Sequence, residues 1–337
     1  MRFLILVSLL FVVSCSDEKK ANVDAQKINS SSSMAAANSS RIEFPRDEGV
    51  HHDKPIEWWY LNSQFSDAVG KKYAFFYCKF STGRHLVSLY DKAADKTLVK
   101  DYYENVNADE TKLDLSSITG NWKQAATPFS YSFLYNYDGV TFQAELKANK
   151  KPFFPGGDGF VGMGQKGTSF YYALTDLTMT GTLKRGTNPV EVMEISGKAW
   201  MDHQWGAWDW ANDFTQWKWY SVQLDNGVDL MLFNIYKNKT LVNSHCGYID
   251  KDNNQYHKLP CQLVAQEYYT DSFGAKWPKR VDLELSSLPG TKLTLIAEKE
   301  QQFIEPRVLW EGSMSVAGTF KGDPVKGSAF QELNRSD

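Results

Sequence analysis

A tryptophan-rich segment contains the residues best suited to acid–base chemistry. Six of the eleven tryptophans lie between Gly197 and Trp219, and they surround the pair Asp202-His203. This density predicts an apolar cavity wall or core layer, because each indole ring contributes a large apolar surface. Such surroundings raise the pKa of a carboxyl group toward neutrality. Asp202 and His203 are therefore candidate catalytic residues.

A second candidate acid opens the aromatic run Glu57-Trp58-Trp59-Tyr60. Either Glu57 or Asp202 could protonate an isolated alkene, while His203 orients the acid or deprotonates a water molecule. The faces of nearby indoles could stabilise the resulting carbocation by roughly 0.5 to 2 kcal/mol each. The predicted ligand-binding residues are the aromatic residues of both segments: Trp58, Tyr60, Trp200, Trp205 and Trp208.

The period of a β-strand limits how these residues can cooperate. In a strand, Asp202 shares one face with Trp200, whereas His203 shares the other face with Trp205. Asp202 and His203 enter one cavity only if a bulge or a strand end intervenes, and Gly206 is compatible with a strand end. The alternative is a structural role, in which the carboxylate caps backbone amides and the imidazole satisfies a buried carbonyl.

Histidine spacing does not predict a metal site. His51-His52-Asp53 places two histidines side by side, and adjacent side chains point apart in an extended chain. His203, His245 or His257 could add a donor, but the sequence has neither a His-x-His nor a Cys-x-x-Cys motif. We therefore predict no metal and no cofactor.

The composition narrows the class of partner. The 337 residues carry a formal net charge of −3 and are 42% hydrophobic. No run of Lys and Arg is interleaved with aromatic residues, so nucleic acid is not a predicted partner. An apolar or neutral small molecule is the expected partner, and the length favours two domains.

The N-terminus is typical of an exported protein. Residues 1–14 combine one Arg with an apolar stretch too short to span a bilayer, and Cys15 follows. Residues 1–15 resemble a lipoprotein signal peptide with Cys15 as the lipidated residue; an ordinary signal peptide or a buried helix is the alternative. Residues 16–42 are polar and rich in small residues, which predicts a flexible tether. Ser16 resembles the sorting signal for the outer membrane, so we expect a lipid-anchored envelope protein.

The body of the chain predicts an all-β fold. Short alternating or aromatic runs are separated by turn residues, and no stretch has a sustained helical stripe. These runs include 73–80, 86–90, 140–146, 230–236 and 292–297.

Two internal repeats predict a duplicated β unit. Trp59-Tyr60 is echoed by Trp219-Tyr220, and the segment from Gly197 to Asp202 is echoed by the segment from Gly327 to Glu332. The recurrence of Trp59-Tyr60 favours a barrel-core role for that pair. The recurrence of an acid at Glu332, in the half without catalytic candidates, favours a structural role for Asp202.

Three cysteines follow the predicted leader. Cys246 and Cys261 flank the turn-rich segment 250–254 and could pair across a hairpin in an oxidising envelope, although the spacing alone leaves this open. Cys78 is expected to be a small buried hydrophobic residue.

The order of the motifs resembles one known family. Segments 44–51, 57–60 and 199–205 are similar to the carotenoid hydratase (hydroxyneurosporene synthase) family and its lipocalin-like relatives, and segments 309–312 and 327–333 resemble its closing strands. The chain departs from that pattern at Glu48 and Gln204, where the family often has His and Glu. The resemblance implies two tandem lipocalin-like antiparallel β-barrel domains, here expected at residues 43–210 and 211–337.

The resemblance also implies a class of ligand. Relatives with this fold include hydratases of plant phytoalexins and fungal Diels–Alder cyclases, so the expected ligand is an apolar isoprenoid-, polyketide- or lipid-like molecule. One hypothesis is acid-catalysed hydration or cyclisation at the domain interface. The alternatives are a non-catalytic carrier that uses the same cavity and a structural envelope module. The fold by analogy does not choose among them.

Overall fold

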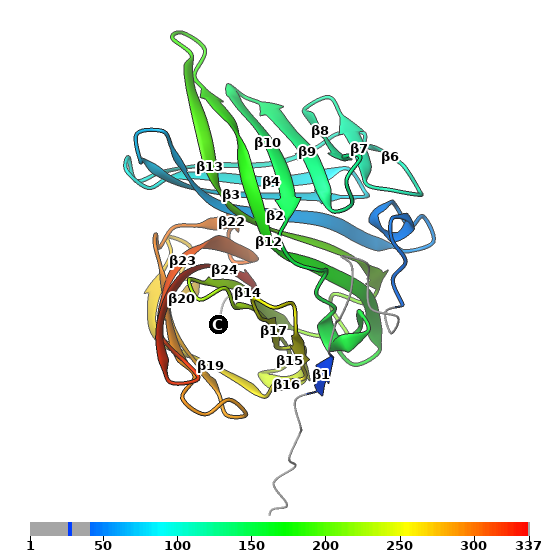
Figure 1. Ribbon diagram of the computed structural model, residues 1–337, viewed down its shortest axis with the longest axis vertical. Helices are drawn as coiled ribbons and strands as arrows, with labels where there is room; N and C mark the ends of the chain where they lie inside the picture. Colours follow the sequence, from blue (N-terminus) through cyan, green and yellow to red (C-terminus); the bar gives the residue numbers. More distant parts are fainter. Residues whose placement is uncertain (1–25, 29–40, 336–337) are drawn as a thin grey trace, which may run out of the picture.

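The computed structural model describes residues 26–28 and 41–335. The described chain forms two curled antiparallel β-sheets of twelve strands each (Figure 1). Besides strands it contains two short 3-10 turns, η1 (Arg46–Glu48) and η2 (Pro155–Gly157). The predicted all-β fold of two tandem lipocalin-like units is confirmed.

The first sheet has the strand order β5-β4-β3-β2-β13-β12-β10-β9-β8-β7-β6, with β11 paired to β12. The two central strands of this sheet, β12 and β13, are long and follow its curvature. The bounds are β2 Ile56–Asp67, β3 Lys72–Phe80, β4 Arg84–Asp91, β5 Lys96–Tyr103, β6 Asn107–Ala108, β7 Asp114–Ser117, β8 Gly120–Gln124, β9 Ser130–Tyr137, β10 Val140–Ala148, β11 Phe160–Met163, β12 Gly167–Arg185 and β13 Glu191–Ala207.

The second sheet has the order β1-β18-β17-β15-β14-β24-β23-β21-β20-β19, with β16 paired to β15 and β22 to β23. It curls around its own interior in the lower half of Figure 1. The bounds are β1 Gln26–Ile28, β14 Gln216–Leu224, β15 Asp229–Lys237, β16 Thr240–Ser244, β17 Gly247–Ile249, β18 Gln255–His257, β19 Cys261–Thr270, β20 Lys276–Leu285, β21 Lys292–Ala297, β22 Phe303–Glu305, β23 Leu309–Phe320 and β24 Asp323–Asn334.

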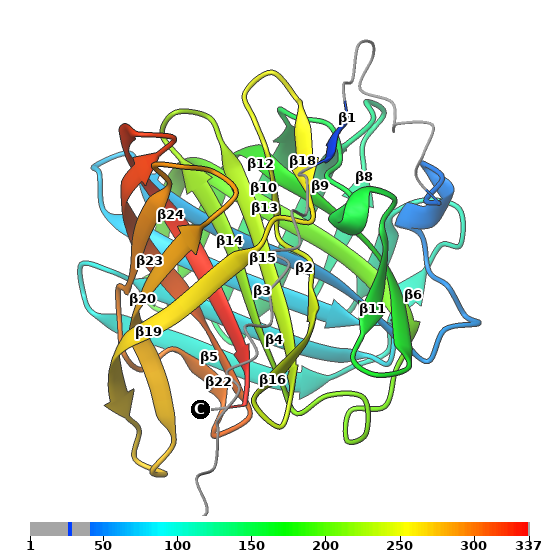
Figure 2. The same ribbon diagram turned by 90° about the horizontal axis from the view of Figure 1, so that it is seen from below.

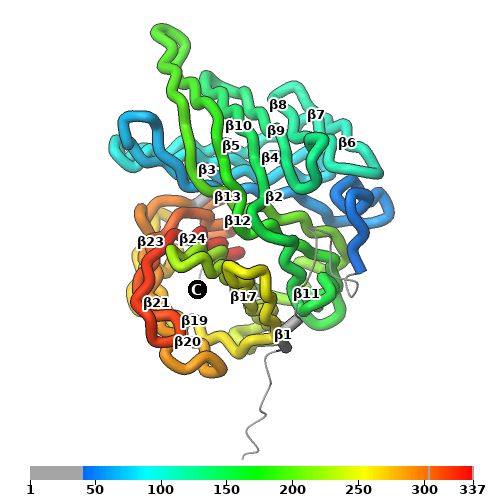
Figure 3. The backbone as a smooth tube through the Cα atoms, in the orientation of Figure 1, coloured from blue at the N-terminus to red at the C-terminus, as the bar shows by residue number. Residues whose placement is uncertain are grey.

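The two sheets pack against each other (Figure 2 and Figure 3), and three apolar cores follow from this packing. Trp59 and Trp122 lie in the interior of the first sheet, and Trp277 and Trp310 lie in the interior of the second. The third core lies between the sheets, where β2, β12 and β13 face β14, β15 and β24. Strands with only one covered face, such as β10, alternate buried and exposed residues, whereas β2 is buried on both faces over most of its length.

Two equivalent glycines allow neighbouring strands to approach closely. A Cβ atom at Gly197 would lie 2.4 Å from the Gln64 carbonyl oxygen, and one at Gly327 would lie 2.2 Å from the Gln223 carbonyl oxygen. Gln64 and Gln223 also bind across the interface, because Gln64 Nε2 donates to the Ala329 carbonyl and Gln223 Nε2 to the Ala199 carbonyl. The glycine repeat therefore marks corresponding places in the two sheets.

The predicted leader and Cys15 lie outside the described residues. Within the segment expected to be a tether, residues 26–28 form β1, which pairs with β18. Among the described residues, no helix has the length and apolarity needed to cross a bilayer.

The pairing considered for the cysteines is present in the structure. Cys246 and Cys261 form a disulfide, while Cys78 is a buried free thiol. The disulfide joins the start of β19 to the segment just before β17 and closes a loop with a sequence separation of 15 residues.

Removing this disulfide is expected to destabilise the protein. A loop of this length predicts a loss of about 3 kcal/mol of unfolding free energy in Cys246→Ala/Cys261→Ala. Urea unfolding with and without a reductant measures the loss. The reductant should lower the midpoint of the unsubstituted protein and leave the double variant unchanged; an insensitive unsubstituted protein would contradict the prediction.

Candidate active site

Strand β13 separates the two leading candidate residues. Its pairing with β2 runs without interruption from Ile195 to Gly206, so no bulge lies between Asp202 and His203. Asp202 faces the interface between the sheets, and His203 faces the interior of the first sheet. The condition under which both could act in one cavity is not met, because neither a bulge nor a strand end breaks the alternation here.

Asp202 is buried at the interface and bound by neutral donors. The Tyr171 hydroxyl donates to Oδ2 at 2.7 Å, and Trp200 Nε1 donates to Oδ1 at 2.7 Å. Trp219 Nε1, from the second sheet, donates in turn to the Tyr171 hydroxyl at 2.9 Å. Desolvation outweighs these hydrogen bonds and raises the pKa of Asp202 to about 8.

Two further carboxyl groups meet Asp202 from the second sheet. Glu311 on β23 and Glu332 on β24 are directly opposite each other in the strand register. The Tyr60 hydroxyl donates to Glu311 Oε1 at 2.7 Å, and Trp217 Nε1 donates to Glu332 Oε1 at 2.6 Å. Desolvation raises the pKa of Glu332 to about 7; desolvation and the Glu332 charge place that of Glu311 well above its ordinary value. The three acids form a protonatable cluster.

An apolar cavity leads to this cluster. A cavity of about 210 Å³ opens at the surface beside the ion pair between Arg84 and Glu305 (2.9 Å), and Glu332 lines its wall. A smaller chamber of about 20 Å³ adjoins it and is lined by both Asp202 and Glu332. The cavity and the chamber share the residues Trp58, Tyr60, Trp217 and Glu332.

Accessibility distinguishes the acids. Asp202 and Glu311 are 4% and 1% exposed. Glu332 is partly exposed as a residue, although protein surrounds its carboxyl group. Glu332 is also the acid of the three that lines the larger cavity. Among these carboxyl groups, Glu332 is therefore the most accessible from the larger cavity.

Most predicted ligand-binding residues lie at this interface. Trp58 and Tyr60 line both spaces, Trp200 binds Asp202, and Trp208 packs edge-on against Trp58 with ring centroids 5.5 Å apart. Trp205 lies elsewhere, because it shares the inward face of β13 with His203 and packs in the interior of the first sheet.

Sequence reasoning missed the residues that the second sheet contributes. The repeat that aligned Asp202 with Glu332 was the signal, since both acids face the same chamber. The Trp-Tyr repeat gave a misleading alignment of the two sheets. Tyr60 lies opposite Asp202, but the residue opposite Glu332 is Trp219 and not Tyr220. The two sheets are thus offset by one residue within that repeat. The predicted barrel-core role holds for Trp59, whereas Tyr60 belongs to the core between the sheets. The residues missed as site candidates are Tyr171 of the first sheet and, from the second sheet, Trp217, Trp219, Glu311 and Glu332.

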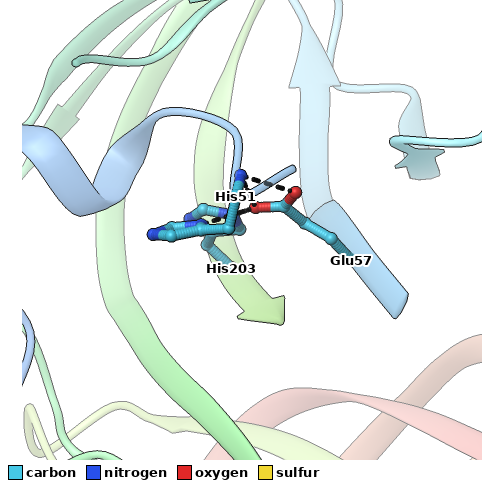
Figure 4. Close-up of side chains that lie close together, drawn as sticks. All are labelled: His51, Glu57 and His203. Atoms are coloured by element: carbon cyan, nitrogen blue, oxygen red, sulfur yellow. Dashed lines mark hydrogen bonds and ion pairs between the residues drawn. The ribbon is translucent and has the colours of Figure 1, made fainter. Parts of the chain in front are cut away.

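Glu57 and His203 meet in a different place (Figure 4). Glu57 Oε1 lies 3.0 Å from His203 Nε2 and 2.8 Å from His51 Nδ1, inside the first sheet. Burial opposes the charge of Glu57, but hydrogen bonds from His203 and His51 outweigh it and lower its pKa to about 2. The prediction that indoles raise the pKa of Glu57 is wrong, because the imidazoles, rather than the indoles, contact its carboxylate.

The raised pKa of Glu332 should appear in the pH dependence of stability. A carboxyl group with a folded pKa of about 7 and an ordinary value of 4.5 stabilises the fold fully below pH 4.5 and loses this contribution as pH rises through about 7. Glu332→Gln should therefore flatten the decline in unfolding free energy between these pH values, as measured by urea unfolding. The exposed-site variant Glu284→Gln should keep the parent slope; an unchanged slope in Glu332→Gln would contradict the prediction.

Solved structures share this architecture. A protein described as an AttH from Nitrosomonas europaea has a TM-score of 0.76 at 21% identity, covering 89% of this chain and 98% of its own. Kievitone hydratase from Nectria haematococca has a TM-score of 0.74 at 17% identity, covering 90% and 96%. CghA, solved with Sch210972, has a TM-score of 0.56 at 12% identity, covering 84% and 88%. At these identities the likeness establishes the fold.

The sequence comparisons give one clear assignment. No functionally curated protein matches the chain. Residues 87–335, which include the strands that carry all three interface acids, match the model of the AttH-like family. The chain therefore belongs to the AttH-like family.

Proposed function

We propose that this protein binds an apolar, unsaturated isoprenoid-, polyketide- or lipid-like molecule between its two sheets and hydrates or cyclises it by acid catalysis. One observation carries the proposal: a protonatable carboxyl group, Glu332, lies where an apolar cavity meets a chamber lined by a second acid, Asp202. Such a site combines an apolar wall with few convergent polar groups, as small-molecule sites do.

Glu332 is the proposed proton donor. Its carboxyl group transfers a proton to one alkene carbon, which leaves a carbocation on the other. Trp58 and Trp217 line the same space, and their indole faces attract positive charge by roughly 0.5 to 2 kcal/mol each. Trp217 Nε1 then stabilises the new carboxylate of Glu332 through the hydrogen bond it already makes.

Water completes the hydration. Its oxygen bonds to the carbocation, and the proton that it releases returns to the Glu332 carboxylate, so the net change is the addition of one water molecule. Asp202 and Gln204 line the chamber and can orient this water. In cyclisation, a second double bond of the same molecule replaces water as the nucleophile, and the proton lost from carbon returns to Glu332.

The similarity to kievitone hydratase supports the hydratase form of this proposal. That protein is named as a hydratase and shares the fold over most of both chains. The support is limited to the scaffold, because one scaffold can host several reactions. The acids and the cavity of this chain carry the chemical argument.

A matched pair of variants tests the proton donor. Glu332 and Glu48 are both enclosed acids whose pKa is raised to about 7 by desolvation, but Glu48 hydrogen-bonds Tyr131 inside the first sheet. The mature protein is incubated with isoprenoid and lipid extracts, and products are identified by mass spectrometry. Glu332→Gln should lower turnover by about 10²- to 10⁴-fold, the range for loss of a general acid, whereas Glu48→Gln should keep it.

Other outcomes would change the assignment. A copurifying ligand that keeps its mass in the unsubstituted protein would favour the non-catalytic carrier. Full activity in Glu332→Gln would remove Glu332 as the acid, and loss in Asp202→Asn alone would transfer that role to Asp202.

We also propose that the protein is a lipoprotein of the cell envelope, anchored through Cys15 to the outer membrane on its periplasmic or surface face. The apolar stretch before Cys15 and the polar, small-residue segment after it support this placement. A membrane anchor would keep an apolar ligand close to its lipid source.

Labelling tests the anchor. When the full chain is expressed in a Gram-negative host with radioactive palmitate, the label should enter the protein and be absent from Cys15→Ala. Cys78→Ala, which removes a buried thiol, should stay labelled. Retention of label in Cys15→Ala would refute lipidation at this residue.

A further inference from the structure

Three potential metal ligands converge inside the first sheet, apart from the acids used above. His51 follows η1, Glu57 lies on β2, and His203 lies on β13. One ligand atom from each residue lies within 4.8 Å of the other two. Glu57 and His203 are buried, and the side chain of His51 is 16% exposed. In Figure 4 both imidazole rings converge on the Glu57 carboxylate.

Asp47 fixes which nitrogens face the centre of the cluster. The Asp47 carbonyl oxygen, which can only accept, lies 3.0 Å from His203 Nδ1, so this nitrogen carries the hydrogen. Asp47 Oδ1 lies 3.4 Å from His51 Nε2 on the outer side of that ring. The inward atoms are therefore His203 Nε2 and His51 Nδ1. Outer hydrogen bonds of this kind orient metal-binding histidines in proteins.

The inward atoms can form a set of metal ligands. Without a metal, His203 Nε2 shares a hydrogen bond with Glu57 Oε1 at 3.0 Å, and a metal ion that displaces the inward proton would find a lone pair on this nitrogen. Glu57 Oε1 lies 2.8 Å from His51 Nδ1 as well. A cation held between the three groups converts these contacts into ligand bonds. Two imidazoles and one carboxylate suit a first-row transition metal better than Mg²⁺ or Ca²⁺, which prefer all-oxygen sites.

The surrounding rings hold the ligands in place, and one ligand borders a cavity. Trp205 stacks on His51 with centroids 4.2 Å apart, and Trp59 stacks on His203 at 4.6 Å. His51, Asp47 and Trp205 line a cavity of about 440 Å³ on the outside of the first sheet's core, whereas Glu57 and His203 lie buried behind them. A metal ion could enter the cluster from this cavity by a movement of the His51 side chain, which is the exposed ligand of the three.

We propose that His51, Glu57 and His203 bind a divalent transition-metal ion, Zn²⁺ by donor type, in a two-histidine, one-carboxylate site beside this cavity. The site links the segment after η1 to two central strands of the first sheet. It lies on the face of β13 opposite Asp202, so it is independent of the proposed acid catalysis. The sequence offered His203 as one of several possible donors to His51-His52-Asp53, but the histidine spacing led to the prediction of no metal, and Glu57 was not among those donors.

Metal binding by the chelator-treated mature protein tests this site. Zn²⁺ is titrated in competition with a chromophoric chelator, and one equivalent should bind. His51→Gln and Glu57→Gln should each weaken the affinity at least about 10-fold. His52→Gln is the matched control, because His52 is the exposed neighbour of His51 and contacts Glu110 at the surface; it should bind like the parent.

Two further readouts keep the test decisive. Co²⁺ in place of Zn²⁺ should give visible absorption bands that are lost in His51→Gln, and Zn²⁺ should raise the thermal unfolding midpoint of the parent but not of that variant. Circular dichroism checks that the variants are folded. Substoichiometric binding by the parent, or equal affinity in His51→Gln and His52→Gln, would overturn the proposal and leave a protonated histidine–glutamate ion pair as the account of the cluster.

Discussion

The alternation of side chains along β13 is the constraint on which both candidate sites depend. Asp202 and His203 are neighbours in the chain, yet an unbroken strand directs them to opposite faces. Both faces are buried, because the interior of the first sheet lies on one side and the second sheet covers the other. One strand therefore forms the wall between an acidic chamber and a histidine–glutamate cluster. The duplication of the β unit creates the chamber, since the outer face of β13 would otherwise meet solvent.

The acids at the interface carry an energetic cost that apolar side chains would avoid. Asp202, Glu311 and Glu332 are removed from water, and indole and phenol groups donate hydrogen bonds to them. Buried charges without a close opposite charge shift toward their neutral forms, which agrees with the raised pKa values of all three. Because hydrophobic residues of similar volume often pack an interface at least as stably, a cluster of this kind is better explained by chemistry than by stability.

The corresponding positions of the two sheets show how far a sequence repeat can be interpreted. Gly197 and Gly327 mark the same structural place, and the acids five residues later face the same chamber. The repeat therefore contained the signal for Glu332, although recurrence of an acid by itself favours a structural role. The repeat gives no such signal for Glu311. Glu311 lies opposite Glu332, and the corresponding residue of the first sheet, opposite Asp202 on β12, is Ala173. The Trp-Tyr repeat is displaced by one residue relative to the strands, and in a period of two this displacement exchanges interior and interface.

The sequence by itself determined the all-β class, the duplicated unit and the apolar, aromatic character of the candidate site, because strand period, turn residues and composition are local properties. It placed Asp202, Trp58 and Tyr60 in one site, but it put Glu57, His203 and Trp205, which lie elsewhere, in the same site. Only the tertiary structure decided that Glu57 and His203 join His51 in a separate cluster, that Glu332 lines the chamber with Asp202, and that Glu311 lies opposite Glu332. These groupings depend on strand register and on the packing of one sheet against the other, which bring together residues far apart in the chain and which no local pattern specifies.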